Sequence, residues 1–392
     1  LYREFNRVGF RIGSSENPRN INLLKYIAWM FDRKHTPEET SGARSYEDRR
    51  NAERDRQAEQ SLAGRDIGPL PEVVNPDRKA ACERNFQLFC ESYFPETYSL
   101  AWSPDHLKVI EKIETAVLRG GLFALALPRG SGKTTITESA ALWSMLYGHR
   151  EFVVLIGATE SAALELLDSL KTELEVNERL AEDFPEVCYP VAQLEGIANR
   201  CAGQLCKGER TRITWTSNEI VLPTVEGSRA SGIIVRVAGI TGRIRGMKFK
   251  RSDGRSVRPS LVIIDDPQTS ESAGSLEQTR KRVRVLAGDI LGLAGPGQKI
   301  SGIMPCTIIR PGDMADIILN RNTHPDWNGE KTRMVYRFPT NMKLWEEYAE
   351  IRAEALRTEG NFQKATEFYL ANREAMDAGA EVSWEARFNH DE

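Results

Sequence analysis

The sequence is short of cysteine, has no long apolar run and carries no excess of either charge. Its six cysteines among 392 residues are too few for a disulfide framework, which favours reduced thiols. Cys201 and Cys206 lie close together, but no second Cys or His pair follows at the spacing of a zinc site. No apolar stretch approaches the roughly 20 residues that cross a bilayer, so we expect no transmembrane segment and no membrane partner. Lys and Arg total 53 and Asp and Glu total 56, which excludes a uniformly basic nucleic-acid binder but not a local basic face.

The overall composition is that of an ordinary globular protein, with 40% hydrophobic and 28% charged residues. At about 150 residues per domain, the length predicts two to three domains. No signal peptide is recognisable at the start of the chain. The chain begins with Leu1 rather than Met and ends within a polar stretch, so we interpret it as a fragment of a longer protein.

Residues 1–80 differ in character from the rest. A short apolar helix is predicted over Leu23–Phe31, and residues 32–59 then mix charges of both signs. Such a mixture is typical of a solvated helix or a mobile arm, and a DNA-binding or partner-binding role stays open. Prolines at 69, 71 and 76 indicate a linker. We therefore predict a charged helical N-terminal arm and linker over residues 1–80.

From residue 82 onward, short apolar runs alternate with helical periodicity. Ser103-Pro104 predicts a capped helix start, and Gly120-Gly121 predicts its end. Apolar runs and periodicities predict strands at 122–127, 152–156, 261–264 and 300–309, helices at 133–146, 162–174 and 276–286, a hairpin within 213–225, and mainly helix over 344–376. Strands that alternate with helices imply an α/β fold with a mostly parallel sheet flanked by helices.

The strongest chemical signal is a glycine-rich segment between a predicted strand and a predicted helix, which is the context of a P-loop. We predict that it binds nucleotide phosphates through Pro128, Arg129, Gly130, Ser131, Gly132, Lys133, Thr134 and Thr135. Glycines let backbone N–H groups turn toward the phosphates, Lys133 reaches the β- and γ-phosphates, and Thr134 ligates Mg²⁺ through its hydroxyl. Leu127 stands where the usual pattern has its first glycine.

The second signal is an apolar strand, 261–264, followed by Asp265 and Asp266. This is the form of a Walker B strand, in which Asp265 holds the Mg²⁺ ion with its water shell. Asp266 is then the residue that orients or deprotonates the attacking water. Glu is usual at the second position, and Asp is one methylene shorter.

Three further residues are candidates for catalysis or coupling. Arg129 lies within the phosphate loop, where a guanidinium stabilises transition-state charge or reports the nucleotide state; a solvent-facing loop arginine is the alternative. Arg245, in the basic turn 242–246, suits a phosphate of DNA or of a neighbouring subunit's nucleotide, and a solvated basic loop is an equal alternative. Thr307, at the end of the fourth predicted strand, is a candidate sensor of the γ-phosphate. His106 is predicted to be a helix-surface or capping residue.

These motifs together resemble the large subunit of tailed-bacteriophage terminases. The resemblance runs from about Phe86 to Pro339 and is carried by the P-loop segment 128–135, Asp-Phe-Pro-Glu (183–186), Gly-Ile-Thr-Gly-Arg-Ile-Arg-Gly (239–246), Asp-Asp-Pro-Gln (265–268), and Thr307 followed by Gly312-Asp313. The arginine within the P-loop is its most specific feature.

The resemblance implies a P-loop NTPase domain of the ASCE (additional-strand, catalytic-Glu) or RecA-like type over residues 81–340. It implies an ATPase that uses ATP and Mg²⁺ to move double-stranded DNA into a procapsid, in the host cell cytoplasm. Its implied partners are duplex DNA, the portal protein and the small terminase subunit, and its implied assembly is a homo-oligomeric ring. By matching positions, Arg129 is the P-loop arginine, Arg245 the arginine before Walker B, and Thr307 part of the coupling motif.

Residues 341–392 are predicted to be a helical linker toward a C-terminal nuclease domain that this chain lacks. The alternative function is a helicase-like or DNA-repair P-loop ATPase acting on nucleic acid. A helicase requires a second RecA-like core, and the residues after Pro339 are too few to form one. A degenerate nucleotide-binding scaffold is the non-enzymatic alternative, and the intact Lys133, Thr134 and Asp265 argue against it.

Overall fold

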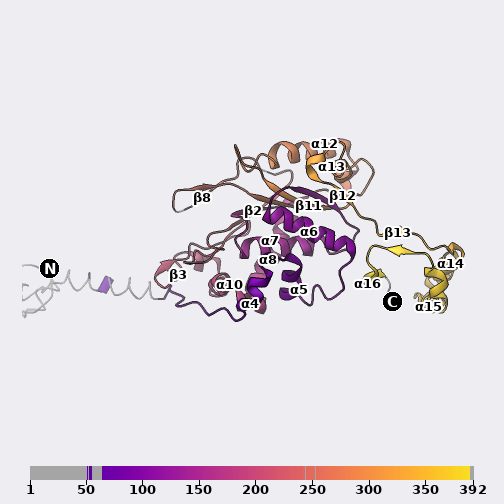
Figure 1. Cartoon of the computed structure of the whole chain (residues 1–392), viewed down its shortest axis with the longest axis horizontal. Coiled ribbons are helices and arrows are strands. Elements are labelled where there is room, and N and C mark those ends of the chain that lie inside the picture. Colours follow the sequence, from indigo (N-terminus) through magenta and orange to yellow (C-terminus); the bar gives the residue numbers. More distant parts are fainter. Residues whose placement is uncertain (1–50, 52, 55–63, 243, 252, 389–392) are drawn as a thin grey trace, which may run out of the picture. The chain divides into compact units, whose positions relative to one another are not determined.

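The computed structural model describes residues 51, 53–54, 64–242, 244–251 and 253–388 (Figure 1). The chain divides into two units, Leu1–Ser61 and Leu62–Glu392, and the second contains all the elements described below. The predicted helix at Leu23–Phe31 and nearly all of the charged stretch 32–59 lie outside the described residues. Within the described ranges, none of the helices has the length and apolarity needed to cross a bilayer.

An eight-stranded mixed sheet forms the centre of the Leu62–Glu392 unit, with the strand order β12-β1-β11-β10-β2-β7-β6-β5. The strands are β1 (Leu122–Ala126), β2 (Phe152–Gly157), β5 (Thr214–Trp215), β6 (Glu219–Val221), β7 (Ile234–Gly239), β10 (Leu261–Asp265), β11 (Ser301–Cys306) and β12 (Glu330–Lys331). Strands from β12 to β7 pair in parallel, whereas β6 and β5 are antiparallel at one edge. The predicted α/β fold with a mostly parallel sheet is therefore confirmed.

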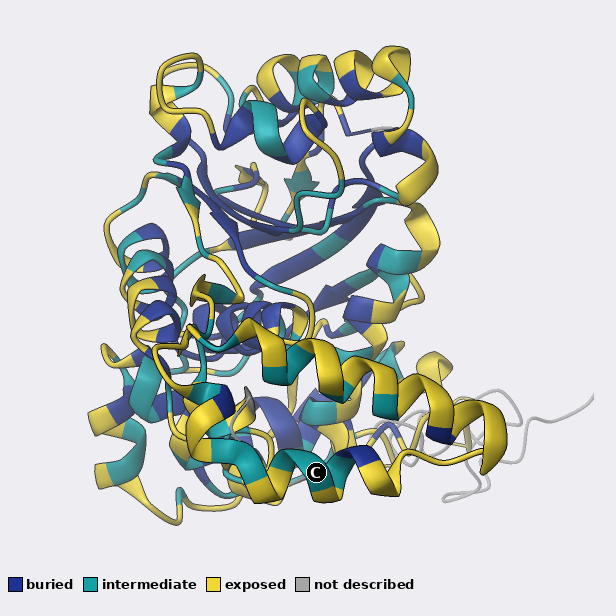
Figure 2. Ribbon diagram, turned by 90° about the vertical axis from the view of Figure 1, so that its right-hand side faces the viewer, coloured by how far each residue is buried: buried dark blue, intermediate teal, exposed yellow. Residues whose placement is uncertain are grey.

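Helices cover both faces of this sheet, so its central strands are buried on both sides (Figure 2). This is why β1, β2 and β10 consist of nearly unbroken apolar residues. The first face carries α4 (Pro76–Cys82), α5 (Phe86–Tyr93), α6 (Pro104–Leu118), α7 (Lys133–Leu146), α8 (Glu160–Val176), α9 (Glu178–Asp183) and α10 (Pro185–Ala192). The second face carries the π-helical turn η2 (Leu286–Ile290), α13 (Met314–Ile318) and η3 (Pro325–Trp327), with α11 (Ser270–Ala273) and α12 (Leu276–Val285) nearby.

Smaller elements occupy the connections. They are η1 (Ala198–Cys201), the strand pair β3 (Leu205–Cys206) and β4 (Glu209–Arg210), and the strand pair β8 (Phe249–Lys250) and β9 (Ser256–Val257). All six cysteines are free thiols. Among the described residues, no group of three or more His, Cys, Asp or Glu side chains is placed to hold a metal ion.

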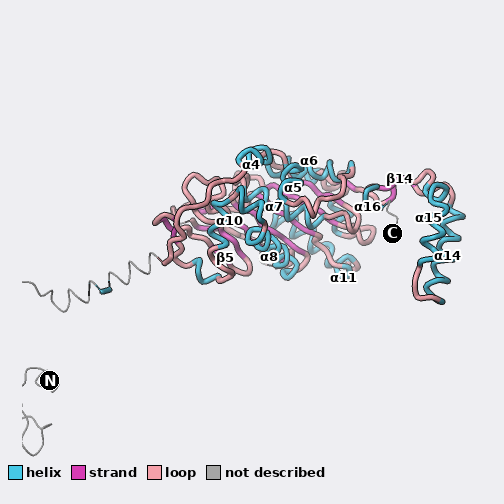
Figure 3. The backbone as a smooth tube through the Cα atoms, turned by 90° about the horizontal axis from the view of Figure 1, so that it is seen from below, coloured by secondary structure: helices cyan, strands magenta, loops and turns pink. Residues whose placement is uncertain are grey.

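The C-terminal part contains the predicted helical segment. It forms α14 (Met342–Thr358) and α15 (Gln363–Asp377), which pack side by side (Figure 3). The chain then returns as β14 (Glu381–Val382), which pairs antiparallel with β13 (Val335–Arg337), and ends in α16 (Glu385–Phe388).

Candidate nucleotide-binding site

The glycine-rich segment forms the loop between β1 and α7, as predicted. Gly130 and Gly132 have φ values of 76° and 73°, a left-handed backbone that favours glycine. Gly132 immediately precedes α7, whose first turn has no side-chain cap. The N-terminus of this 14-residue helix is therefore open to an anion. Leu127, at the usual position of the first glycine, is buried in the core, and its N–H donates to the carbonyl of Cys306 at 3.2 Å.

Lys133 lies inside the loop rather than in solvent, with 8% of its surface exposed. Its Nζ donates to the carbonyls of Leu127 and Pro128 at 3.4 and 3.3 Å. The same Nζ lies 4.0 Å from Oδ2 of Asp266. The ammonium is thus held between the loop backbone and the second acidic residue of the 265–266 pair.

Thr134 and Asp265 meet at the carboxyl edge of the sheet. The Thr134 hydroxyl donates to Oδ2 of Asp265 at 2.9 Å. The other carboxylate oxygen, Oδ1, is buried without a hydrogen-bond partner. Burial raises the pKa of Asp265 to about 6, opposed by the Thr134 hydrogen bond. A hydroxyl and a carboxylate with an unused buried oxygen are a donor set that fits Mg²⁺ bound together with nucleotide phosphates.

Asp266 is held in a constrained backbone conformation. Its φ is 37°, in the left-handed region that residues other than Gly, Asn and Asp rarely adopt. Its N–H donates to the carbonyl of Pro305 at 3.1 Å, which ties it to the end of β11. The Thr307 hydroxyl lies 3.5 Å from Oδ2 of Asp266. The structure therefore brings Lys133, Asp266 and Thr307 together at one place.

Two buried polar residues fix the loops that carry Asp266 and Thr307. The sequence did not indicate their roles. Gln268 donates to the carbonyl of Thr307 at 3.0 Å and to Oδ2 of Asp313 at 2.8 Å. Asp313 caps α13 and accepts from the N–H groups of Ile309 and Arg310 at 2.8 and 3.0 Å. This network connects the loop after β10 with the loop after β11. An aspartate just before a helix is a capping signal, but no sequence rule pairs it with Gln268.

The two candidate arginines differ in position. Arg129 is exposed on the phosphate loop. Arg245 follows β7, which lies four strands from β1 in the sheet order. At roughly 4.8 Å per strand this is about 19 Å from the P-loop strand. The Arg245 side chain pairs with Asp289 of η2 and is 80% exposed. Arg129 is thus on the glycine-rich loop itself, whereas the Arg245 side chain contacts Asp289 and follows a strand four places away in the sheet.

His106 supports the phosphate loop from α6. It forms a capping box with Ser103, which confirms the predicted capping role, but it is buried rather than on the helix surface. Nδ1 of His106 accepts from the Ser103 N–H at 3.3 Å, and Nε2 donates to the Ser131 carbonyl at 3.0 Å. Burial lowers the pKa of His106, which favours this neutral form. Nearby, the Tyr98 hydroxyl donates to the Thr135 carbonyl at 3.1 Å.

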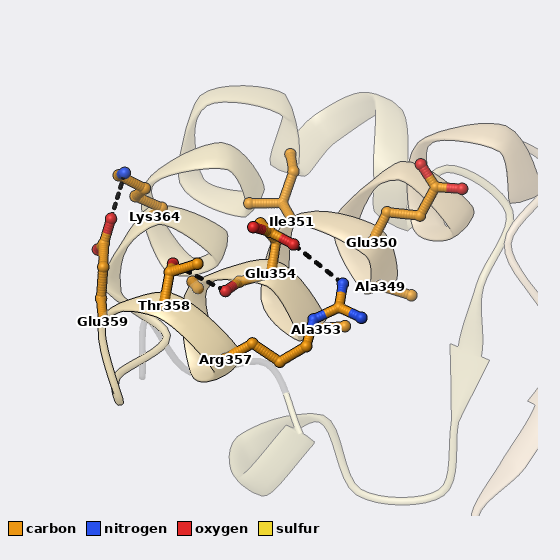
Figure 4. Close-up of a pocket in the computed structure, with 10 residues that line it drawn as sticks. Ala349, Glu350, Ile351, Ala353, Glu354, Arg357, Thr358, Glu359 and Lys364 are labelled. Carbon is orange, nitrogen blue, oxygen red and sulfur yellow. Dashed lines mark hydrogen bonds and ion pairs between the residues drawn. The ribbon is translucent and has the colours of Figure 1, made fainter.

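The hollow drawn in Figure 4 is a separate feature. It measures about 710 Å³ and lies on α14 and the start of α15, and none of the predicted site residues lines it. Four of its charged side chains pair locally: Arg357 with Glu354 at 3.0 Å, and Lys364 with Glu359. Since these charges already satisfy one another, the candidate site remains the sheet edge around Lys133.

Comparison of the chain with models of protein families and with curated proteins finds no match.

Proposed function

We propose that this chain is a Mg²⁺-dependent ATPase of the P-loop class. The observation that carries the proposal is the hydrogen bond between Thr134 and Asp265, with Lys133 buried beside them. The strand order supports the ASCE or RecA-like type, because one strand, β11, lies between the P-loop strand β1 and the Asp265 strand β10. In this type, β11 is the additional strand, and Thr307 follows its carboxyl end.

The residues have distinct roles in the proposed hydrolysis. Lys133 and the backbone of 128–135 bind the phosphates, with Arg129 beside them. Thr134 and Asp265 hold Mg²⁺, which neutralises charge on the phosphates. Asp266 orients the attacking water and accepts its proton, and Lys133 and Thr307 adjoin its carboxylate. The hydrogen bond between Gln268 and Asp313 fixes the loop after β10 to the loop after β11.

We further propose that the ATPase is the motor subunit of a phage terminase that moves double-stranded DNA into a procapsid in the host cytoplasm. Seven of the 16 residues from 243 to 258 are Lys or Arg, against one Asp, and this segment follows β7 and includes β8 and β9. Such a basic segment suits the phosphates of duplex DNA. The Arg245 side chain is exposed and pairs with Asp289 of its own chain, which suits action on a neighbouring subunit's nucleotide in a ring. The portal protein and the small terminase subunit are the proposed partners.

Steady-state ATP hydrolysis, with and without duplex DNA, tests the proposal, with Lys133→Ala as the blank. We expect Mg²⁺-dependent turnover that duplex DNA stimulates and that Lys133→Ala abolishes. Turnover near wild type in Lys133→Ala would reject the P-loop assignment. Stimulation by single-stranded DNA alone would favour the helicase-like ATPase over the packaging motor.

A further inference from the structure

The segment that follows α15 returns to the phosphate loop. β14 pairs with β13, and the Tyr336 hydroxyl of β13 donates to Oδ2 of Asp105 at 2.7 Å. Asp105 lies in the first turn of α6 and is buried. The strand pair β13–β14 is thereby attached to the end of α6 that supports the phosphate loop.

Trp384 continues this attachment. Its Nε1 donates to the Ala101 carbonyl at 2.8 Å, and its ring meets the His106 ring edge to face, with centroids 4.6 Å apart. His106 in turn donates to the carbonyl of Ser131 in the phosphate loop. Trp384 therefore contacts the loop through a single intervening side chain.

Arg387 lies against the loop itself. A Cβ built ideally on Gly130 would come within 2.8 Å of Nη2 and 3.2 Å of Cζ of Arg387. The Arg387 guanidinium also lies 5.8 Å from the centroid of the Trp384 ring, a cation–π distance. A side chain at position 130 would require this guanidinium to move, whereas glycine allows both the positive φ of the loop and the close approach of the arginine.

We propose that Arg387 binds the phosphates of a nucleoside triphosphate at the P-loop, and that Trp384 positions it. This inference rests on the proposed ATPase function and deepens it. The guanidinium has five N–H donors in a planar fork that matches phosphate oxygens. Arg387 supplies a second guanidinium from the C-terminal segment, in addition to Arg129 of the loop. Nucleotide binding is thereby linked to the segment 381–387, because release of that segment removes a phosphate ligand.

Binding of a fluorescent ATP analogue to the full chain, with Mg²⁺, tests this inference. We expect Arg387→Ala to weaken binding about tenfold or more, as loss of a charge-assisted hydrogen bond predicts. Arg387→Lys keeps the charge but loses the fork, so it should recover binding only in part. Arg337→Ala is the matched control, because Arg337 is exposed in the same strand pair and contacts Glu381. It should bind like wild type.

Two further variants separate the possible failures. Lys133→Ala should lose binding; if it does while Arg387→Ala binds like wild type, the ATPase proposal stands and this inference is wrong. If Lys133→Ala also binds like wild type, the P-loop assignment itself fails. Trp384→Ala should weaken binding of the ATP analogue as Arg387→Ala does. Because both variants remove the same contact, the double variant should bind the analogue no more weakly than either single variant. Tighter binding or faster turnover in Arg387→Ala would overturn the inference, because the segment would then obstruct the site.

Discussion

Thr134 and Asp265, 131 positions apart in the sequence, are joined by a 2.9 Å hydrogen bond at the carboxyl edge of the sheet. The contact follows from topology. β1 leads into the loop before Thr134, and β10 ends at Asp265, and both strands pair in parallel with β11. Parallel strands end at a common edge, so the two motifs meet there. Oδ1 of Asp265 is left buried and unpaired, ready for a further ligand.

The two adjacent carboxylates should have separable effects. We expect Asp265→Asn to reduce the Mg²⁺-dependent part of nucleotide affinity. We expect Asp266→Asn to bind ATP but to lower turnover about 10²- to 10⁴-fold, the usual contribution of a general base. Asn tolerates the left-handed backbone at position 266, so the loop should keep its shape. Titration of a fluorescent ATP analogue with and without Mg²⁺, beside turnover assays, measures both. Equal turnover in Asp266→Asn and wild type would contradict the assignment.

Arg245 should act on the nucleotide of a neighbouring subunit. The strand that precedes it, β7, lies four places from β1, and its guanidinium pairs with Asp289 in its own chain. We expect Arg245→Ala to lower turnover on the order of 10³-fold in the assembled protein, as removal of an arginine finger does. Mixing Arg245→Ala with Lys133→Ala subunits should restore part of the turnover, since each supplies what the other lacks.

Arg255→Ala is the control for this mixing experiment, because Arg255 is exposed in the same basic segment and pairs with Asp253. Assayed without DNA, it should keep wild-type turnover without complementation. Failure of the mixture to recover any activity, in subunits that still assemble, would place the Arg245 effect within one chain.

The strands with unbroken apolar runs could be predicted from the sequence, whereas strands with a charged or polar interior could not. The predicted helix 133–146 agrees with α7, and the strands at 122–127 and 261–264 agree with β1 and β10 to within a residue or so. β7 was missed because Arg236 interrupts its apolar run. In the structure this arginine donates through Nε to Glu219 of the neighbouring strand β6 at 2.7 Å, which satisfies its charge beside a buried strand. β12 was missed because it is a two-residue polar edge strand.

The residues of the candidate site also differ in whether they could be predicted from the sequence. Residues that belong to one motif, or to strands of one parallel sheet, could be assigned from spacing because topology brings strand ends together. The contact of Trp384 with His106 could not, because it depends on how a segment 278 positions later folds back. The Gln268–Asp313 contact depends likewise on the packing of two loops.

Asp183 of the Asp-Phe-Pro-Glu segment has a structural role in the fold. Fully buried, it accepts from Nε of Arg78 at 2.6 Å and from the Tyr93 hydroxyl at 2.7 Å. We expect Asp183→Asn to lower the free energy of unfolding by about 3–5 kcal/mol, because it leaves a charged arginine without its buried partner. Glu182→Gln is the control, since the same arginine reaches this exposed carboxylate at 2.6 Å. Glu182→Gln should lower the free energy of unfolding by less than about 1 kcal/mol. Denaturant titration measures both, and equal losses would contradict the structural role.

His149 should make the fold less stable in mild acid. Its Nε2 donates to the Glu83 carbonyl at 2.8 Å, and its ring lies between those of Trp143 and Tyr147. Burial lowers its pKa below the ordinary value of about 6.5. The charges of Arg229 and Arg84 act in the same direction, whereas the hydrogen bond to the Glu83 carbonyl and the charge of Glu83 oppose it without reversing the shift. The His149 side chain therefore binds a proton more readily in the unfolded chain than in the folded one. The contribution of neutral His149 to the free energy of unfolding is complete above about pH 6.5 and is lost as the pH falls below that value.

His149→Gln tests this pH dependence, because glutamine keeps an N–H donor for the Glu83 carbonyl but does not titrate. Denaturant titrations at pH 7.5 and 5.5 should show that wild type loses more stability between the two than the variant does. His106, whose pKa burial also lowers, is present in both proteins, so its contribution cancels in the comparison. An equal loss in the two proteins would mean that His149 accepts its proton in the folded state as readily as in the unfolded one. The packing of its ring between Trp143 and Tyr147 argues against that outcome, since a charged imidazolium there would lie among side chains that offer it little solvation.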